Sequence, residues 1–420
     1  MSNLEAYLEI LNEELRPALG CTEPIAVAFC AAKAKEALGS LPDHVDVYCS
    51  GNIIKNVKAV TVPNSNGQKG IEVAAMLGIV GGRADKELEV LNSVTEEDIK
   101  LADKLISEKI INVFHEKDVD NLYVRVELSK GTETASCIVK TKHTFVSEIK
   151  KNGKVIFKEK DLIGDSRADK SCLNLKDIYN FAKTVDVEKI KPLLKQQVEY
   201  NYAIAKVGLK ENYGANVGKT LLEVFGEDNV MAKAAATAAA GSDARMNGCA
   251  LPVVINSGSG NQGIAVSMPL YVYAKEKNVD EENLYRALAL ANLVSLLQKR
   301  YIGDLSAYCG ACCAGCSSIC GIAFLEGQDY ETIGHIIINT ASTIGGMVCD
   351  GAKSSCAAKI AASVMSGFVA YAQAKNDRSF KPGEGMIVED IEQTIANFGR
   401  MGREGMKSTD EEILQIMLGN

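Results

Sequence analysis

The stretch NLYVRVELSKGTETASCIVKTKHTFVSEIKKNGKVIFKE, residues 121–159, is the part of the sequence that separates a strand-containing region from the helical remainder of the chain. It contains three runs in which apolar and polar residues alternate, the pattern of a strand with one buried face. Lys130-Gly131 and Asn152-Gly153 stand between the runs and are typical of hairpin turns. The stretch therefore predicts a small antiparallel meander.

The segments around this meander have other periodicities. Upstream, HVDVYCSGNIIKNVKAVTVPN (44–64) also alternates and ends in Pro63-Asn64, which predicts strands and a turn, whereas residues 85–120 show a charged, helical pattern. From about residue 175 to the C-terminus, the apolar residues recur at helical spacing. The first 40 residues also indicate two helices, the second of them rich in alanine.

These patterns predict an α+β fold, with a mostly helical part and a smaller α/β part that contains the antiparallel meander. Residues 41–170 would form the α/β domain, and residues 171–420 the helical domain, in which we place the candidate catalytic motifs described below. We expect the helices of residues 1–40 to pack with the C-terminal helical part. A chain of 420 residues with 47% hydrophobic content is long enough for two such domains.

The composition argues against several classes of partner. The formal net charge is -8 and no block of Lys and Arg stands out, so we expect no nucleic acid partner. No run of about 18 uncharged apolar residues occurs, which argues against a membrane span. The acidic N-terminus, MSNLEAYLEILNEELRPALG, lacks the basic start and apolar block of a signal peptide. We therefore expect a cytoplasmic protein, in which thiols stay reduced.

Seven of the thirteen cysteines lie in the last third of the chain. An odd number of cysteines in a reducing compartment points to metal binding or catalysis rather than to disulfides. Five of them lie in the segment LSAYCGACCAGCSSICG: Cys309, Cys312, Cys313, Cys316 and Cys320.

At helical spacing these five thiols fall on one stripe, separated by Ala, Gly and Ser. The pattern is typical of a closely packed helix in which cysteine serves as a small apolar residue. Two alternatives stay open. Cys309, Cys313 and Cys316 have the C-x3-C-x2-C spacing of radical enzymes that bind S-adenosylmethionine, although only about a hundred mostly helical residues follow them. A zinc site is disfavoured because the chain has four histidines and none lies near these cysteines.

A second cysteine motif, GGMVCDGAKSSCAAKIAA (345–362), places Cys349 and Cys356 seven residues apart. On a straight helix they would be separated by about 10 Å of rise, too far for neighbouring corners of one cluster. Asp350-Gly351 supplies a turn signal between them. We therefore expect one thiol in a loop and the other at a helix start, where the helix dipole favours a thiolate.

Two polar motifs complete the set. In LGCTEP, Thr22 looks like the N-cap of a helix, and Cys21 just before it would have a thiol pKa below the usual value of about 8.5. The Gly/Ser/Asn-rich NSGSGNQG (256–263) could surround a small anion with backbone N–H groups and hydroxyls. We find no glycine-rich phosphate loop followed by a suitable helix start, which argues against a pyridoxal phosphate enzyme.

Taken together, these motifs resemble the iron–sulfur L-cysteine desulfidases, which are related to the iron–sulfur L-serine dehydratases (alpha chain). The resemblance runs over essentially the whole chain and rests on LGCTEP (19–24), SGN-x2-KN (50–56), NSGSGNQG (256–263), LSAYCG (305–310) and GM-x-CDGAK-x-SC (346–356). It implies a [4Fe-4S] cluster held by three cysteines, with one iron site open for substrate. By position the ligands would be Cys309, Cys349 and Cys356, which leaves the other cysteines of the stripe as packing residues.

The resemblance also implies an activity, a carbon–sulfur lyase that eliminates sulfide from L-cysteine to give pyruvate, ammonia and sulfide. L-Serine is the alternative substrate, and an iron–sulfur electron carrier or sensor is the non-catalytic alternative. Cys21 becomes the candidate general base, with a fourth, displaceable cluster ligand as its alternative role. The expected partner is a small amino acid, and a homo-oligomer is compatible with the sequence. The implied substrate-binding residues are Thr22, Asn52, Lys55, Asn256, Ser257, Ser259, Gly260 and Asn261.

Overall fold

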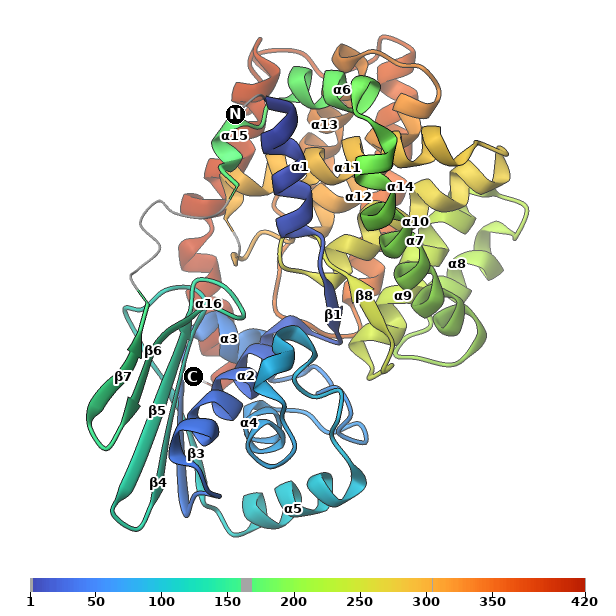
Figure 1. Ribbon diagram of the computed structural model, residues 1–420. Coiled ribbons are helices and arrows are strands. Elements are labelled where there is room, and N and C mark those ends of the chain that lie inside the picture. Colours follow the sequence, from blue (N-terminus) through green and yellow to red (C-terminus); the bar gives the residue numbers. More distant parts are fainter. Residues whose placement is uncertain (1–2, 160–167, 304, 420) are drawn as a thin grey trace.

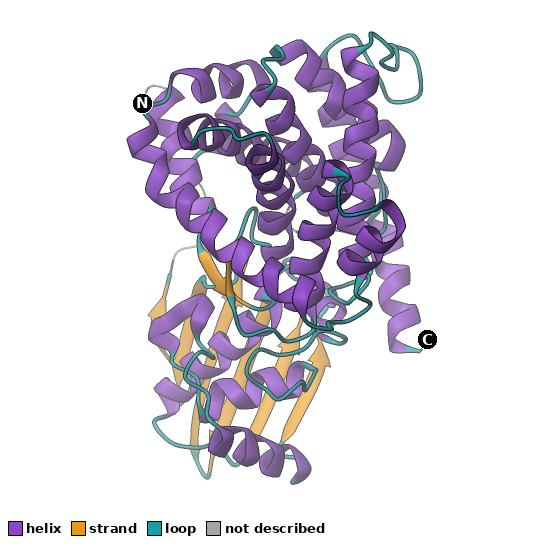
Figure 2. Ribbon diagram, turned by 90° about the vertical axis from the view of Figure 1, so that its right-hand side faces the viewer, coloured by secondary structure: helices purple, strands orange, loops and turns teal. Residues whose placement is uncertain are grey.

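The computed structural model describes residues 3–159, 168–303 and 305–419. It has an α/β part below and a helical part above in Figure 1, and Figure 2 shows the helices stacked over one end of the sheet. The predicted α+β class, with its meander and its mostly helical second part, is confirmed.

The α/β part is built on a six-stranded sheet with the order β3-β2-β4-β5-β6-β7. Only β2 and β3 run parallel, and the other neighbours are antiparallel. The predicted meander has four strands rather than three, and Asn152 and Gly153, with φ of 50° and 75°, make its last hairpin turn as expected. The strands are β2 (His44–Cys49), β3 (Ile111–His115), β4 (Tyr123–Lys130), β5 (Glu133–Lys140), β6 (Val146–Lys151) and β7 (Lys154–Lys158).

Helices cover one side of this sheet (Figure 1). The helix α2 (Thr22–Leu38) packs on β4 and β5 and also against α4 (Ile71–Val80). A Cβ on Gly78 would lie 2.2 Å from the carbonyl oxygen of Ala28, so glycine is required where α4 crosses α2. The other helical elements here are α3 (Gly51–Val57), η1 (Ala84–Glu89) and α5 (Glu96–Ser107).

Three expectations for this part need correction. Residues 85–120, expected to be helical, contain the strand β3 as well as η1 and α5. The segment 44–64 is not made of strands alone, because β2 is followed directly by the helix α3. The second N-terminal helix, α2, belongs to the core of the α/β part and not to the helical part. One side of α2 faces the sheet and another faces α4, so alanine and other apolar residues occur all around the helix. The hydrophobic pattern therefore has no single apolar face and could not indicate which part of the protein covers α2.

The helical part is a cluster in which α10, α11 and α12 are almost wholly buried. The first helix, α1 (Asn3–Glu14), packs here against α6, α7 and α11. None of the described helices combines the length and apolar character needed to cross a membrane. The helices are α6 (Leu175–Thr184), α7 (Val187–Lys210), α8 (Val217–Phe225), α9 (Val230–Met246), α10 (Gly260–Glu276), α11 (Glu281–Ile302), α12 (Ala311–Leu325), α13 (Tyr330–Ile344), α14 (Cys356–Lys375), α15 (Ile391–Arg400) and α16 (Lys407–Leu418), with the short turns η2 (Lys170–Cys172) and η3 (Met401–Gly405).

Two connections tie the parts together. The strand β1 (Pro17–Leu19), which leads from α1 to α2, pairs antiparallel with β8 (Pro252–Val254) of the helical part. The last helix, α16, returns to the α/β part, where Leu414 is buried in its core beside α3. The junction between the parts is therefore crossed by several segments that are distant in sequence.

Candidate active site

A cavity of about 170 Å³ lies at this junction and is lined by residues of both parts. A dry cavity of about 150 Å³ can hold a benzene-sized molecule, so the space suits a small ligand. Four helices begin at its wall: α2, α10, α12 and α14. Their unpaired N–H groups and dipoles make the cavity favourable for negative charge.

Cys309 and Cys349 are brought together by a short backbone pairing. Tyr308 and Val348 form an antiparallel bridge, with Cys309 N–H donating to the Met347 carbonyl (2.9 Å) and Cys349 N–H to the Ala307 carbonyl (2.6 Å). Because side chains alternate along extended chain, Cys309 and Cys349 project to the same face. A hydrogen bond between the two thiols lowers the pKa of Cys349 below its usual range, and the same bond raises that of Cys309.

Cys356 is the first residue of α14, at the end of the loop that starts after Cys349. The expected break between these two cysteines is present, and Gly351 in the loop has a φ of 96°. A Cβ at Gly351 would lie 2.3 Å from the carbonyl oxygen of Lys55, so the loop needs glycine for its close approach to α3. Burial raises the pKa of the Cys356 thiol.

Cys309, Cys349 and Cys356 all line the cavity. In the described part of the chain, no three His, Cys, Asp or Glu side chains stand close enough to hold a single metal ion. The ligands of a cubane cluster bind different irons and are spaced more widely than the ligands of one ion. Three thiols around one cavity, next to the starts of α12 and α14, are a donor set that fits such a cluster.

The remaining cysteines of the stripe do not reach the cavity. Cys312, Cys313, Cys316 and Cys320 are buried within α12, and Cys309 stands before the helix begins. Close helix packing surrounds them, since a Cβ on Gly315 would lie 2.7 Å from Cβ of Ser363 on α14. Their position is that of small apolar residues in a core.

Cys21 also lines the cavity, but its surroundings differ from the expectation. Helix α2 begins at Thr22, which makes Cys21 the N-cap residue in place of Thr22, and its thiol makes no cap hydrogen bond. The Sγ instead donates to Oε2 of Glu23 at 3.0 Å. Burial, and then the negative charge of Glu23, raise the pKa of Cys21 well above its usual value, so the expectation of a lowered pKa is wrong.

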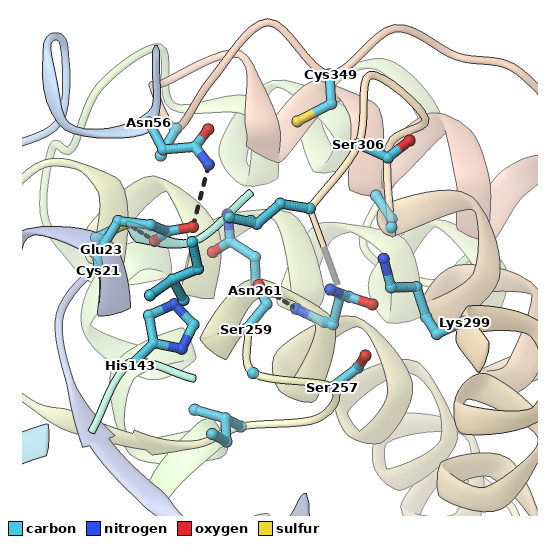
Figure 3. A pocket seen from close by; sticks show the side chains of 18 of the residues that line it. Cys21, Glu23, Asn56, His143, Ser257, Ser259, Asn261, Lys299, Ser306 and Cys349 are labelled. Atoms are coloured by element: carbon cyan, nitrogen blue, oxygen red, sulfur yellow. Dashed lines mark hydrogen bonds between the residues drawn. The ribbon is translucent and has the colours of Figure 1, made fainter. Parts of the chain in front are cut away.

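Five of the NSGSGNQG residues line the cavity: Ser257, Gly258, Ser259, Asn261 and Gln262. Figure 3 labels Ser257, Ser259 and Asn261; Gly260, which was also expected here, does not line the cavity. Ser257 has a φ of 50°, unusual for a residue with a side chain and a mark of a constrained loop. The Ser259 side chain caps α10 by accepting from the Gln262 N–H. Asn256 lies beneath the loop, fully buried, where its side chain bonds Asn292 and Ser295 and supports the loop without lining the cavity.

Three other expected substrate contacts are not brought to the cavity wall. Thr22 is buried and donates to the Gly258 carbonyl at 3.0 Å. Lys55 is 1% exposed and pairs with Asp410 of α16, which neutralises it as a carboxylate-binding charge. Asn52 does not line the cavity. Asn56, one turn later on α3, does line it and donates to Oε1 of Glu23 at 3.3 Å.

The structure adds site residues that the sequence did not indicate. Figure 3 shows Glu23 and His143 on the side of the cavity near Cys21, and Lys299 on the other side. His143 belongs to the turn between β5 and β6, and Arg245 to the last turn of α9. The sequence around neither residue indicates a functional site, since His143 lies in a hairpin connection and Arg245 in an alanine-rich helix. Glu23 was visible in LGCTEP, but only as part of a helix start.

Comparisons with known proteins identify the family of the chain. A family model described as serine dehydratase alpha chain matches residues 85–415. A UPF0597 protein of Desulfitobacterium hafniense (strain Y51) is 48% identical, over 99% of this chain and 96% of that protein. A UPF0597 protein of Lachnoclostridium phytofermentans is 47% identical over 98% and 99% of the two chains, and one of Bacteroides thetaiotaomicron is 37% identical over 99% and 98%.

The class defined by these matches is that of the serine dehydratase-like proteins. This chain belongs to the serine dehydratase alpha chain family, whose name describes a lyase. The resemblance to the serine dehydratase alpha chain is thereby confirmed.

Proposed function

We propose that this protein is a cytoplasmic [4Fe-4S]-dependent lyase that eliminates the β-substituent of a small L-amino acid, with L-cysteine as the substrate and pyruvate, ammonia and sulfide as the products. The observation that carries the proposal is the convergence of Cys21, Cys309, Cys349 and Cys356 on one small cavity from three separate segments. The family match supports an elimination of this type.

Cys309, Cys349 and Cys356 would hold the cluster. Three thiolate ligands would leave one iron site of such a cluster open, and the cluster would there supply Lewis acidity toward the β-substituent of the substrate. The starts of α12 and α14 favour the negative charge of the thiolates. Lys359 adds a positive charge near Cys309 and Cys349, where it is fixed by an ion pair with Asp350 at 2.6 Å.

Cys21 and Glu23 form the proton-transfer pair. The raised pKa means that the thiol holds its proton, and the Glu23 carboxylate at 3.0 Å is positioned to take it. The resulting thiolate removes the Cα proton of the substrate while the β-substituent leaves with the bonding electron pair. The enamine product tautomerises and is hydrolysed to pyruvate and ammonia.

Glu23 is held for this role by hydrogen bonds to both oxygens. Asn56 donates to Oε1 and the Cys21 thiol donates to Oε2, while the Thr22 hydroxyl lies 3.1 Å from Oε2 and gives its single proton to the Gly258 carbonyl. The two donors keep the carboxylate turned toward Cys21, as Figure 3 illustrates for Asn56. They also place three residues of LGCTEP and one of SGN-x2-KN in a single network.

The test is an anaerobic purification followed by iron and sulfide analysis, and then by assays of pyruvate formation from L-cysteine and L-serine. We expect about four irons per chain and a higher kcat/KM for L-cysteine. A higher kcat/KM for L-serine would favour the second candidate, an L-serine dehydratase, which the family match supports. A protein that holds iron but forms no pyruvate from either amino acid would favour an electron carrier or sensor.

A further inference from the structure

Arg245 is a buried cation at the cavity wall. The residue is 3% exposed and lines the cavity from the last turn of α9. One guanidinium nitrogen, Nη1, donates to Oδ1 of Asn261 at 3.1 Å, while the buried Nε has no hydrogen-bond partner. Over the described ranges, no carboxylate comes within ion-pair distance of this side chain. A buried charge without a counter-ion is costly, so the site is incomplete without an anion.

The backbone around Arg245 is shaped to accommodate the guanidinium. A Cβ on Gly260 would lie 2.4 Å from its Nε, so only glycine at the start of α10 leaves room for it. The first turn of α10 lines the same cavity through Ser259 and Asn261. Unpaired N–H groups of that turn and the guanidinium therefore favour an anion in the same space.

The lysines at the cavity wall already have partners. Lys299 donates to the Gly303 carbonyl at 2.6 Å, and Lys142 pairs with Glu13. Lys170 pairs with Glu14 at 2.5 Å. Arg16, the other arginine at the wall, also has an unpaired Nε, but its side chain is partly exposed and pairs with Glu87 at 3.8 Å. Arg245 is therefore the buried arginine of the wall that has no carboxylate partner among the described residues.

We propose that Arg245 binds the α-carboxylate of the amino-acid substrate, with Asn261 orienting the guanidinium. This inference rests on the proposed function and replaces Lys55, the resemblance-based candidate, whose charge is taken by Asp410. The planar guanidinium can donate two parallel hydrogen bonds to a carboxylate, which fixes the orientation of Cα as well as binding the charge. Arg245 is thus a specificity-determining residue that selects α-amino acids over amines.

The test uses L-alanine, which has the α-carboxylate but no β leaving group, and L-alaninamide, in which that charge is removed. Binding of each to the anaerobically purified protein is measured by calorimetry. Wild type should bind L-alanine at least about tenfold more tightly than L-alaninamide. Arg245→Met should weaken L-alanine binding by about 10- to 100-fold, the range for a hydrogen bond to a charged group, and should leave L-alaninamide binding nearly unchanged.

Two further variants guard against a simple loss of folding. Arg245→Lys keeps the positive charge but cannot donate two parallel hydrogen bonds to a carboxylate, so it should weaken L-alanine binding by an intermediate amount. Asn261→Asp keeps Arg245 but supplies an internal carboxylate, so it too should weaken L-alanine binding. Arg286→Met is the matched control, because Arg286 binds the carbonyls of Ala182, Lys183 and Val185 away from the cavity, and it should bind both probes as wild type does.

Unchanged preference for L-alanine over L-alaninamide in Arg245→Met would overturn the proposal, as would the absence of this preference in wild type. These outcomes are independent of turnover. A protein that forms no pyruvate yet loses L-alanine binding on Arg245→Met would refute the lyase and retain the carboxylate site.

Discussion

The hydroxyl of Thr22 donates a hydrogen bond to the backbone carbonyl of Gly258, 3.0 Å away and 236 residues later in the chain. This bond joins the start of α2, in the α/β part, to the loop before α10, in the helical part. Both segments line the cavity, so the bond helps to fix the distance between Cys21 and Glu23 on one wall and the loop of Ser257 and Ser259 on the other.

We predict that Thr22→Val lowers the free energy of unfolding by about 1–3 kcal/mol, because a buried hydrogen bond is lost without a change in side-chain shape. The same variant should raise KM for the amino-acid substrate, since the two walls of the cavity lose a fixed spacing. Denaturant unfolding and steady-state kinetics measure the two effects. Thr22→Ser keeps the hydroxyl and should stay close to wild type; an equal loss in both variants would show that the methyl group matters instead.

Alanine variants of the cysteines should fall into two groups that differ in iron content. Cys309→Ala, Cys349→Ala and Cys356→Ala should each abolish cluster retention, because each removes one of the three thiols at the cavity wall. Cys312→Ala, Cys313→Ala, Cys316→Ala and Cys320→Ala should retain the iron at a packing cost of about 1 kcal/mol. Iron analysis of anaerobic preparations measures this. If Cys313→Ala and Cys316→Ala lost iron while Cys356→Ala kept it, the C-x3-C-x2-C spacing of the radical enzymes would be favoured.

The sequence predicted the elements whose patterns are local. Alternation of side chains and the Asn152-Gly153 turn located the meander, and the turn signal at Gly351 located the break between Cys349 and Cys356. The placement of α2 was missed, since a helix buried on several sides carries no direction in its sequence. The helix α3 was missed because the alternating pattern of β2 was taken to continue beyond Cys49, into residues that are helical.

In the candidate site, too, the residues within sequence motifs could be predicted, whereas those defined by tertiary contacts could not. Motifs identified Cys21, Ser257 and Ser259, which do reach the cavity. The role of Lys55 could not be judged, because its partner Asp410 lies 355 residues away. Arg245 carries no signal of its own, and only the tertiary contact with Gly260 and the absence of a nearby carboxylate among the described residues make it notable.

The buried carboxyl of Asp243 should make stability depend on pH. It is 1% exposed; Oδ2 accepts from the Gly218 N–H at 3.2 Å, and Oδ1 has no partner. Burial raises its pKa to about 6. In the unfolded chain this group ionises near pH 3.9, so the folded state binds more protons between that pH and about 6, and stability falls as pH rises through this window.

Asp243→Asn removes that loss while keeping an oxygen for the Gly218 N–H. We expect the variant to melt higher than wild type at pH 7, with a difference of up to about 3 kcal/mol in unfolding free energy, and to show no advantage near pH 4. Thermal melts across this pH range measure the effect. A difference that does not change between pH 4 and pH 7 would mean that Asp243 is not the titrating group.

The proton-transfer pair can be tested apart from the cluster. Cys21→Ser should keep the iron and bind substrate but lose about 10²- to 10⁴-fold in turnover, because a serine hydroxyl is far less acidic than a thiol. Glu23→Gln should cause a similar loss, because the amide cannot take the Cys21 proton. Asn56→Ala, which frees one carboxylate oxygen of Glu23 without removing the pair, should lose less.

The direct measurement is exchange of the substrate Cα hydrogen with solvent deuterium, followed by mass spectrometry in wild type and in the three variants. We expect exchange to fall in parallel with turnover in Cys21→Ser and Glu23→Gln. Exchange at the wild-type rate in Cys21→Ser would assign the base to another group, and His143, at the same side of the cavity (Figure 3), would be the next to replace. Loss of iron in Cys21→Ser would instead identify the thiol as a fourth, displaceable ligand of the cluster.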